Sequence, residues 1–195
     1  MHTSVRRIAI AALALPLLLA GCADDEPVPK TAEPTTPATS VTETVETNEP
    51  GEPIEPTLPP EAEGKGRKAA EAFIRHYYDT VNYAQATGDT MGLRALALRS
   101  CAACEGGADA IDRVSKQGGT INGGEYTVTA TRAVGRQDFS GAASLYYFRV
   151  SVVSATQEVT GTKDLDGDYG GGRTRLRFQV ASSDIGLQVA EWSTL

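Results

Sequence analysis

Aromatic residues and prolines divide this 195-residue chain into two parts that cannot fold in the same way. Every Phe, Tyr and Trp lies at or after Phe73, whereas nine of the ten prolines lie between Pro27 and Pro60. A segment without aromatic side chains buries too little apolar surface to offset the entropy that it loses on ordering. The sequence therefore predicts a disordered, Thr/Pro/Glu-rich tether over residues 22–66 and one folded domain over residues 67–195.

Charge follows the same division. Residues 22–66 carry eleven Asp and Glu against two Lys, whereas residues 67–195 carry equal numbers of acidic and basic side chains. Like charges and prolines keep a linker extended, so we expect the tether to reach from ~40 Å as a flexible coil to ~140 Å when stretched. A neutral domain behind an acidic linker argues against nucleic acid as a partner.

The first 22 residues have the layout of an export signal. Arg6 and Arg7 precede an apolar run of 13 residues from Ile8 to Ala20, which is shorter than the roughly 20 residues that cross a bilayer. The run ends in Leu19-Ala20-Gly21-Cys22, which resembles the bacterial lipobox at all four positions. This resemblance implies a signal peptide over residues 1–21, cleavage before Cys22 and a diacylglyceryl thioether on Cys22. The alternative is an ordinary secretory signal with a chance cysteine.

An acylated Cys22 makes the membrane the first expected partner of the chain. Acyl chains contribute about 0.8 kcal/mol per buried methylene, so two or three chains on one residue hold a protein stably to a membrane. The expected location is the extracytoplasmic face of the cell membrane, with the lipid on Cys22 as the anchor.

The first part of the domain has the apolar period of helices. Gly88 is expected to end the first helix, and Asp89 or Thr90 to cap a second that runs through Leu93, Leu96 and Ala97. Ser100 is expected to cap a third helix that ends at residues 118–119. The apolar stripe of the first helix consists of Phe73, Ile74, Tyr77, Tyr78 and Val81.

After Gly119 apolar and polar residues alternate, as they do in strands. Four such runs are expected to be strands: residues 126–132, 145–153, 175–180 and 185–189. Helices followed by strands predict an α+β fold, with about three N-terminal helices packed on a curved antiparallel sheet of four or more strands.

Several strings in the domain are similar to those of a known family. They are Phe73-Ile74-Arg75-His76-Tyr77-Tyr78, then Asn82-Tyr83-Ala84-Gln85-Ala86-Thr87-Gly88-Asp89, then Ser100-Cys101-Ala102-Ala103-Cys104, and the glycine pairs at 118–119 and 123–124. Together they resemble, over residues 71–195, a family of actinobacterial lipoproteins known only as a domain of unknown function. The resemblance implies no activity. The order of helices and sheet is also similar, in layout alone, to the cystatin and nuclear-transport-factor-like cone folds.

Cys101 and Cys104 are the cysteines that remain once Cys22 is acylated. Outside the cytoplasm two thiols usually form a disulfide, and at a helix start this spacing brings their Cα atoms within about 6 Å. We therefore expect a disulfide that fixes the helix start. Thiol–disulfide exchange enzymes use the same spacing, but here no βαβ pattern precedes it and no proline follows it. Metal ligation by the pair is a third, weaker alternative.

Two further motifs fit only in part. Residues 164–168 match the first ligands of a calcium loop, but Tyr169 and Arg175 stand where glycine and a bidentate glutamate are needed. We expect a hairpin loop there and no metal. His76 is the one histidine left after removal of the signal, and any zinc site or Ser-His-Asp triad needs it. A position at the edge of the apolar stripe, with no catalytic task, is the favoured interpretation of His76.

Tyrosines and arginines are the other candidates for a site. Arg173, Arg175 and Arg177 alternate on one strand face and could meet an anion, although such a row more often is solvated or protects a sheet edge. Five tyrosines are numerous enough to line a cavity between helices and sheet, although core packing is their ordinary role: Tyr77, Tyr78, Tyr83, Tyr146 and Tyr147.

These features favour a lipid-anchored, non-catalytic binding or envelope-associated module. The expected partners are the membrane and a cell-wall or envelope protein, with no cofactor and no nucleic acid. The alternative is a small hydrolase or isomerase with a cone-shaped cavity, in which His76, Asp79 or a tyrosine acts as acid or base. A strongly shifted pKa inside a deep pocket would favour that alternative.

Overall fold

The computed structural model describes residues 51–140 and 143–195. The signal peptide, Cys22 and the tether up to residue 50 lie outside the described residues. Their predicted roles therefore stay predictions.

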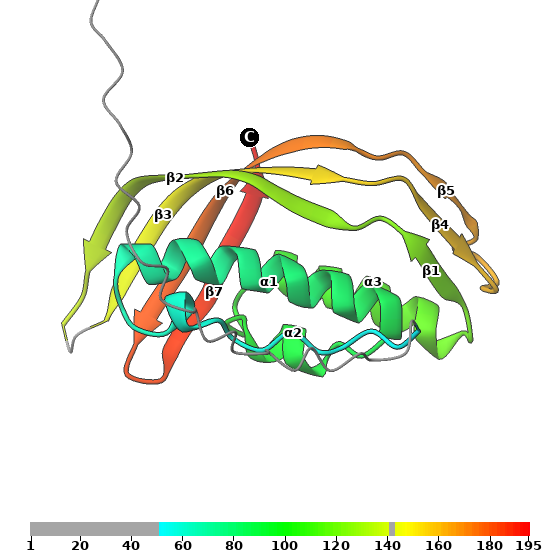
Figure 1. Cartoon of the computed structure of the whole chain (residues 1–195), viewed down its shortest axis with the longest axis horizontal. Helices are drawn as coiled ribbons and strands as arrows, with labels where there is room; N and C mark the ends of the chain where they lie inside the picture. The colour runs from blue at the N-terminus through cyan, green and yellow to red at the C-terminus, as the bar shows by residue number, and fades with distance from the viewer. Residues whose placement is uncertain (1–50, 141–142) are drawn as a thin grey trace, which may run out of the picture. The chain divides into compact units, whose positions relative to one another are not determined.

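Three helices follow one another in the first half of the domain: α1 (Arg67–Thr87), α2 (Met91–Ala95) and α3 (Ala102–Lys116) (Figure 1). Helix α1 buries the predicted stripe, with Phe73 and Ile74 at most 2% exposed. Gly88 ends it in the left-handed conformation (φ 75°), which glycine adopts without steric cost, and its N–H donates to the Ala84 carbonyl. The Asp89 carboxylate accepts the Met91 N–H at the start of α2, as the sequence predicts.

The strands of the described residues form two antiparallel sheets. The larger has the order β2-β3-β6-β7, and the smaller has the order β1-β4-β5. The four longer strands are β2 (Tyr126–Asp138), β3 (Ser144–Ser154), β6 (Gly172–Ser183) and β7 (Gly186–Thr194). The short ones are β1 (Thr120–Gly123), β4 (Gln157–Thr160) and β5 (Gly167–Tyr169). Two register shifts in β2, after Val128 and after Ala133, mark bulges that bend the larger sheet.

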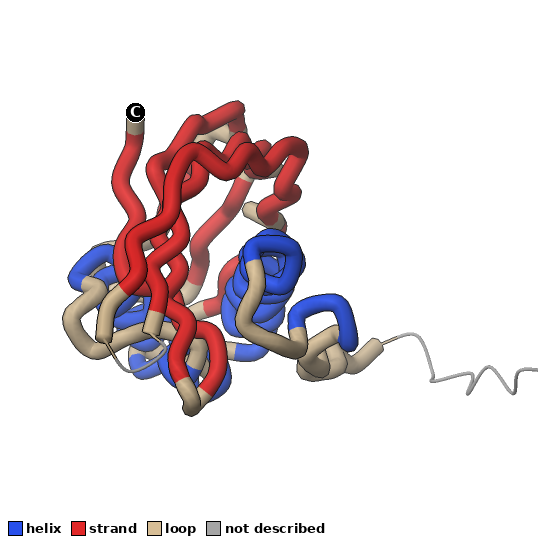
Figure 2. Tube along the Cα trace, turned by 90° about the vertical axis from the view of Figure 1, so that its left-hand side faces the viewer, coloured by secondary structure: helices blue, strands red, loops and turns tan. Residues whose placement is uncertain are grey.

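The helices lie on the concave side of the curved larger sheet (Figures 1 and 2). Its inward side chains alternate with outward ones, so that Phe148, Val150, Phe178, Val180 and Val189 are each at most 1% exposed. They form one core with the buried faces of α1 and α3. This arrangement confirms the predicted α+β fold, in which helices pack on a curved antiparallel sheet.

The ordered body begins before residue 67, which differs from the predicted end of the tether at residue 66. A 3-10 turn, η1 (Pro60–Ala62), precedes α1, and Ala62 is 2% exposed. The Lys65 carbonyl accepts hydrogen bonds from the Tyr146 hydroxyl (2.8 Å) and the Ser182 hydroxyl (3.2 Å). A few such contacts are enough to hold an extended segment in place, even though its sequence has no apolar period. The composition of residues 51–66 therefore does not predict that this segment is ordered.

Three local predictions are wrong. Cys101, not Ser100, is the N-cap of α3. The last strand starts at Gly186, and Ile185 lies outside it, 83% exposed. Residues 96–97 follow α2 instead of continuing it; the N–H of Val189 in β7 donates to the Leu96 carbonyl at 2.8 Å, so tertiary pairing overrides helix propensity there.

None of the described helices is long and apolar enough to span a bilayer.

Candidate functional site

A cavity of about 480 Å³ lies between α1, α3 and the sheets. Its walls are mostly apolar, and every strand contributes to them. Cavities of this size, apolar with a few polar groups, are typical sites for small molecules. It is therefore the candidate functional site of the domain.

Helix α1 forms an aromatic wall of this cavity. Tyr77, Tyr78, Val81 and Gln85 line it, because residues spaced by one, four and eight positions share a helix face. The ring centroid of Tyr77 lies 5.6 Å from that of Tyr78, whose ring in turn lies 5.8 Å from that of Tyr126 on β2. These edge-on and tilted contacts pack the three rings against one another along this wall.

Helix α3 leaves room on the opposite side. Gly107 lines the cavity, and a Cβ built on it would meet no atom within 4 Å. Glycine in a helix interior destabilises by roughly 0.5–1 kcal/mol relative to alanine, and no close contact in the structure requires it here. Arg113, exposed on the same helix, is the one charged residue that lines the cavity, and it makes no ion pair with any residue of 51–140 or 143–195.

Two buried polar atoms in the lining have no hydrogen-bond partner among the described residues: the Gln85 Oε1 acceptor and the Trp192 Nε1 donor. Leaving such an atom unsatisfied costs about 1–3 kcal/mol. Trp192 pairs with Phe178 across β6 and β7, and this places the indole on the inner face of the sheet. The cavity thus has a donor and an acceptor that a bound molecule or water would satisfy.

Burial shapes the acid–base behaviour of this wall. Desolvation raises the pKa of Tyr77 to about 12 against an opposing effect of the nearby Trp192 indole, which lowers it although the two groups do not meet in hydrogen-bond geometry. Desolvation also raises the pKa of Tyr78, and the neighbouring Tyr77 and Tyr126 raise it further. A general acid or base works best with a pKa near the working pH. Both phenols therefore stay protonated at neutral pH, so each keeps an O–H group that can donate a hydrogen bond.

The two other candidate acid–base residues do not reach the cavity. His76 and Asp79 line a separate hollow beside residues 59–61. His76 is 5% exposed, and burial lowers its pKa, partly offset by the nearby Asp79. The structure therefore does not bring His76, Asp79 and the cavity tyrosines together into one catalytic arrangement.

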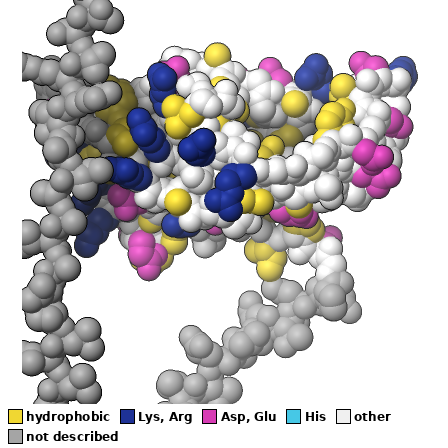
Figure 3. Space-filling view, turned by 90° about the horizontal axis from the view of Figure 1, so that it is seen from above, with side chains coloured by type: hydrophobic (Ala, Val, Ile, Leu, Met, Phe, Trp, Pro, Cys, Tyr) yellow, Lys and Arg dark blue, Asp and Glu magenta, His cyan; other side chains and the backbone are white. Residues whose placement is uncertain are grey.

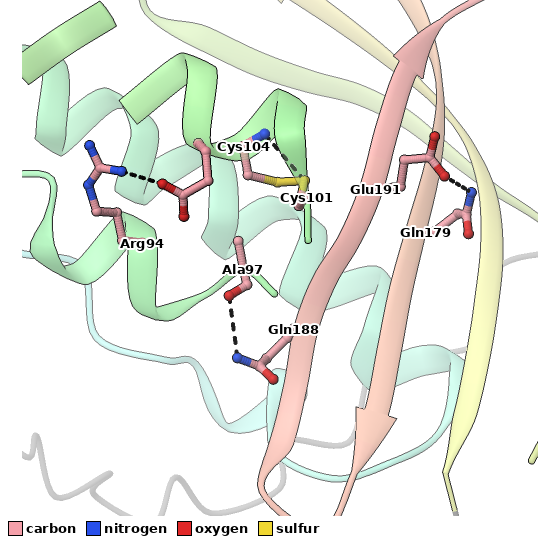
Figure 4. Close-up of a disulfide and its surroundings, with 8 residues drawn as sticks. Arg94, Ala97, Cys101, Cys104, Gln179, Gln188 and Glu191 are labelled. Atoms are coloured by element: carbon pink, nitrogen blue, oxygen red, sulfur yellow. Dashed lines mark hydrogen bonds and ion pairs between the residues drawn. A yellow bond between two sulfur atoms is a disulfide. The ribbon is translucent and has the colours of Figure 1, made fainter. Parts of the chain in front are cut away.

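Cys101 and Cys104 are joined by a disulfide, with an S–S distance of 2.05 Å and Cα atoms 5.2 Å apart (Figure 4). The Cys101 sulfur also accepts the Cys104 N–H at the start of α3. Both residues are at most 4% exposed, and thiol–disulfide exchange needs access to a sulfur. The predicted pair is thus confirmed, and its burial argues against an exchange enzyme. Cys104 also lines the cavity.

An ion cluster ties α2 to α3 close to the disulfide, and Figure 4 shows Arg94 with one of its carboxylate partners. The Arg94 guanidinium lies 2.5 Å from Glu105, 2.7 Å from Asp109 and 3.2 Å from Asp112. Hydrogen bonds from the Thr90 hydroxyl and from Lys116, together with the charge of Lys116, lower the pKa of Asp112 to about 2. The cluster therefore joins α2 to α3, and both helices contribute residues to the cavity wall.

The carboxylates of the acidic loop at residues 164–166 already accept hydrogen bonds from nearby protein groups. The Asp166 carboxylate accepts hydrogen bonds from the Thr162 N–H and hydroxyl, which lower its pKa. Asp164 accepts from the Gln117 amide. No three His, Cys, Asp or Glu side chains gather as metal ligands within the described part of the chain.

The sequence names only part of the site. Of the five candidate tyrosines, Tyr77 and Tyr78 line the cavity. The half-buried Tyr83 is not part of the lining, Tyr146 faces the core, and the Tyr147 hydroxyl donates to the Gln137 side chain. The lining residues Gln85, Gly107, Arg113 and Trp192 were not among the predicted site residues. Gln85 carried a signal, since it continues the α1 stripe one turn beyond Val81.

The fold and the cavity define the class of this chain: an α+β domain that encloses an apolar pocket between helices and sheet. The chain belongs to a family of unknown function (DUF6318), whose family model matches residues 36–171. This confirms the predicted membership of a family without known activity. The actinobacterial and lipoprotein character implied by the resemblance stays a prediction, as does the likeness to cone folds.

Solved structures show only distant likeness. The chain is similar to the intermembrane space region of the chloroplast protein ARC6, with 12% identity, a TM-score of 0.47 and coverage of 68% of this chain and 98% of that one. A periplasmic fragment of TraM gives 12% identity and a TM-score of 0.44, covering 66% and 96% of the two chains. Aln2 from a Streptomyces species gives 8% identity and a TM-score of 0.38, with coverage of 67% of this chain and 93% of that one. TM-scores below 0.5 support no argument about function. No curated protein matches the sequence.

Proposed function

We propose that this protein is a lipid-anchored extracytoplasmic module that binds an amphiphilic small molecule without catalysis. The apolar part of the ligand fills the cavity between α1, α3 and the sheets, and its anionic head reaches Arg113. The observation that carries the proposal is the cavity of about 480 Å³, apolar but for a few polar side chains and lined by a single charged residue.

Three features of the lining support an amphiphile. The aromatic and aliphatic walls favour burial of a hydrocarbon body, at about 25 cal/mol per Å² of apolar surface removed from water. The Gln85 oxygen and the Trp192 N–H offer one acceptor and one donor. Arg113 offers a guanidinium, whose planar donor fork matches a carboxylate or phosphate.

The acid–base chemistry of the cavity supports binding over hydrolysis or isomerisation. A shifted pKa inside a deep pocket was expected to favour an enzyme, and Tyr77 has one. The raised pKa makes the phenol a weaker acid and leaves almost no phenolate at neutral pH to act as a base. The described lining contains no carboxylate and no histidine to act with it.

Support for the anchor comes from the sequence alone. The Leu19-Ala20-Gly21-Cys22 string and the apolar run before it resemble a lipoprotein signal, and an acylated Cys22 would hold the module at the outer face of the membrane. Mass spectrometry of the mature N-terminus tests this part. A diacylglyceryl group on Cys22 is expected, and an unmodified thiol there would refute the anchor while leaving the cavity argument untouched.

Trp192 gives a direct assay for the cavity, because it is the one tryptophan in the chain. Titration with decanoate should change its fluorescence and saturate, and decanol should bind more weakly. Replacing Arg113 with Gln should lower the affinity for decanoate by roughly fivefold, the upper range for an exposed ion pair, and should leave decanol unaffected.

Neighbouring glycines on α3 provide a matched pair of variants. Gly106 and Gly107 both have open space around a built Cβ, but only Gly107 lines the cavity. Gly107→Leu should abolish the fluorescence response, and Gly106→Leu should preserve it. An equal response in both variants, or no saturable response in the unaltered protein, would show that the cavity is not a binding site for this class of ligand.

A further inference from the structure

Five arginines occupy the outer face of the larger sheet, away from the cavity and the helices. Arg132, Arg149 and Arg177 stand directly opposite one another in register across β2, β3 and β6. Arg175 and Arg173 continue the set at alternate positions along β6. All five are exposed. Figure 3 looks down on this face and shows Lys and Arg side chains spread over it. We call these five residues the arginine face.

No carboxylate of the described residues neutralises the arginine face. The ion pairs within residues 51–140 and 143–195 involve Lys65, Arg94, Lys116 and Arg136 as the basic partners, and none of the five. The one acid on the neighbouring strand β7, Glu191, accepts from the Gln179 amide at 2.8 Å. The positive charge on this face is therefore available to an outside partner.

The fold gives no structural reason for the arrangement. Like charges directly opposite on adjacent strands destabilise a sheet, and here two such pairs stand in succession. Edge protection, the ordinary role of charged strand residues, does not apply to β3 and β6, because they are the two inner strands of the order β2-β3-β6-β7. Four of the five arginines belong to these inner strands.

The geometry of the face indicates a flat, phosphate-bearing partner. Adjacent strands lie about 5 Å apart and alternate residues along a strand about 7 Å apart, so the guanidinium groups form a two-dimensional array. The five line neither the apolar cavity nor the hollow beside His76, whereas a single linear polymer would call for a groove. All are Arg and none is Lys, and Arg binds phosphate through two parallel hydrogen bonds.

We propose that the arginine face docks on a bilayer surface rich in anionic phospholipid. The exposed side chain of Val134 on β2 and the half-buried ring of Tyr147 on β3 lie beside the arginines and suit the interfacial region of a lipid headgroup layer. The inference rests on the proposed function only in that a lipid on Cys22 would bring this surface to a membrane. Docking itself depends on neither the acyl group nor the cavity.

Vesicle co-sedimentation of the mature chain, residues 22–195, carrying Cys22→Ser tests the proposal without any contribution from an acyl group or from the apolar run of the signal peptide. Phosphatidylcholine vesicles with and without phosphatidylglycerol are compared. The face variant replaces Arg132, Arg149 and Arg177 with Gln, and the matched control replaces three exposed basic residues elsewhere, Lys68, Arg99 and Lys163, with Gln. Basic residues near an anionic surface contribute about fivefold each to partitioning, so the face variant should bind anionic vesicles roughly a hundredfold more weakly. The control should bind almost as well as the parent.

Several outcomes would overturn the proposal. They are equal binding of the parent to neutral and anionic vesicles, an equal loss in the face variant and the control, and binding to soluble polyphosphate without binding to vesicles. Arg149→Gln alone, with an expected loss of about fivefold, serves if the triple variant does not fold. Gly107→Leu should leave vesicle binding unchanged, so failure of the cavity proposal and failure of this one are distinguishable.

Discussion

The Arg94 cluster makes a sharp prediction about stability. Arg94 belongs to a helix of only five residues, α2, and its guanidinium contacts three carboxylates of α3: Glu105, Asp109 and Asp112. Replacing Arg94 with Met retains an unbranched side chain of similar length and removes the charge. The three acids then stand three to seven residues apart on α3, with only Lys116 on Asp112 to offset them.

The contacts set the size of the effect. Exposed ion pairs contribute about 0.2–1 kcal/mol each, and the carboxyl side chains here range from 21% exposed at Asp112 to 63% at Asp109. Like charges three or four positions apart on a helix add roughly 0.2–0.5 kcal/mol of repulsion per pair. Arg94→Met should therefore lower the free energy of unfolding by about 2 kcal/mol.

Urea denaturation in two backgrounds checks the cause. With Glu105→Gln, Asp109→Asn and Asp112→Asn in place, Arg94→Met should cost less than about 0.5 kcal/mol, because the coupling between the partners is gone. Asp112 adds a pH signature. Its folded pKa of about 2 lies below the usual 3.8, so its stabilisation is present at neutral pH and is lost as the pH falls from about 4 towards 2. The same cost of Arg94→Met in both backgrounds would refute the ion-cluster account.

Two further predictions concern the walls of the cavity. Replacing both Cys101 and Cys104 with Ala should lower the free energy of unfolding by roughly 2 kcal/mol, as expected for so short a closed loop; an unchanged urea midpoint would show that the disulfide does not stabilise α3. The protein should lose stability on alkaline titration because of Tyr77. The pKa of this phenol is raised from 10.0 to about 12 in the folded state. Deprotonation therefore favours the unfolded chain, and the free energy of unfolding falls as the pH rises from 10 towards 12. Tyrosinate absorbance should show one late-titrating group fewer in Tyr77→Phe, and an identical titration curve would contradict the burial of this phenol.

The sequence predicted the elements whose pattern is long and regular. The α1 stripe and the alternation in β2, β3 and β6 each span several residues, so one face of each element is defined by the sequence itself. The smaller sheet was missed because β1, β4 and β5 are three to four residues long, too short for a period to show. Their strands form only because the chain folds back on itself beside the larger sheet.

The candidate site was harder to predict, since it depends on register and on absent atoms. Trp192 faces the cavity because it pairs with Phe178 after a bulge between Gln179 and Val180, and no local pattern reveals that shift. Gly107 leaves space in the cavity because it has no side chain. The arginine face shows the same limit, since Arg173, Arg175 and Arg177 are visible as a row, but their match with Arg149 and Arg132 needs the strand order.

The cavity and the arginine face both depart from what stability alone would select. Three features each destabilise the fold by roughly 0.5 to a few kcal/mol: Gly107 in a helix interior, two polar atoms of the cavity wall that have no partner among the described residues, and arginines opposed on neighbouring strands. Folded domains are only marginally stable, so such features persist more readily where they have a task, and a local rule broken without evident structural gain points to function. Because the two features lie on opposite faces of one sheet, the same strands can hold a ligand on the inside while the outer face rests on a charged surface.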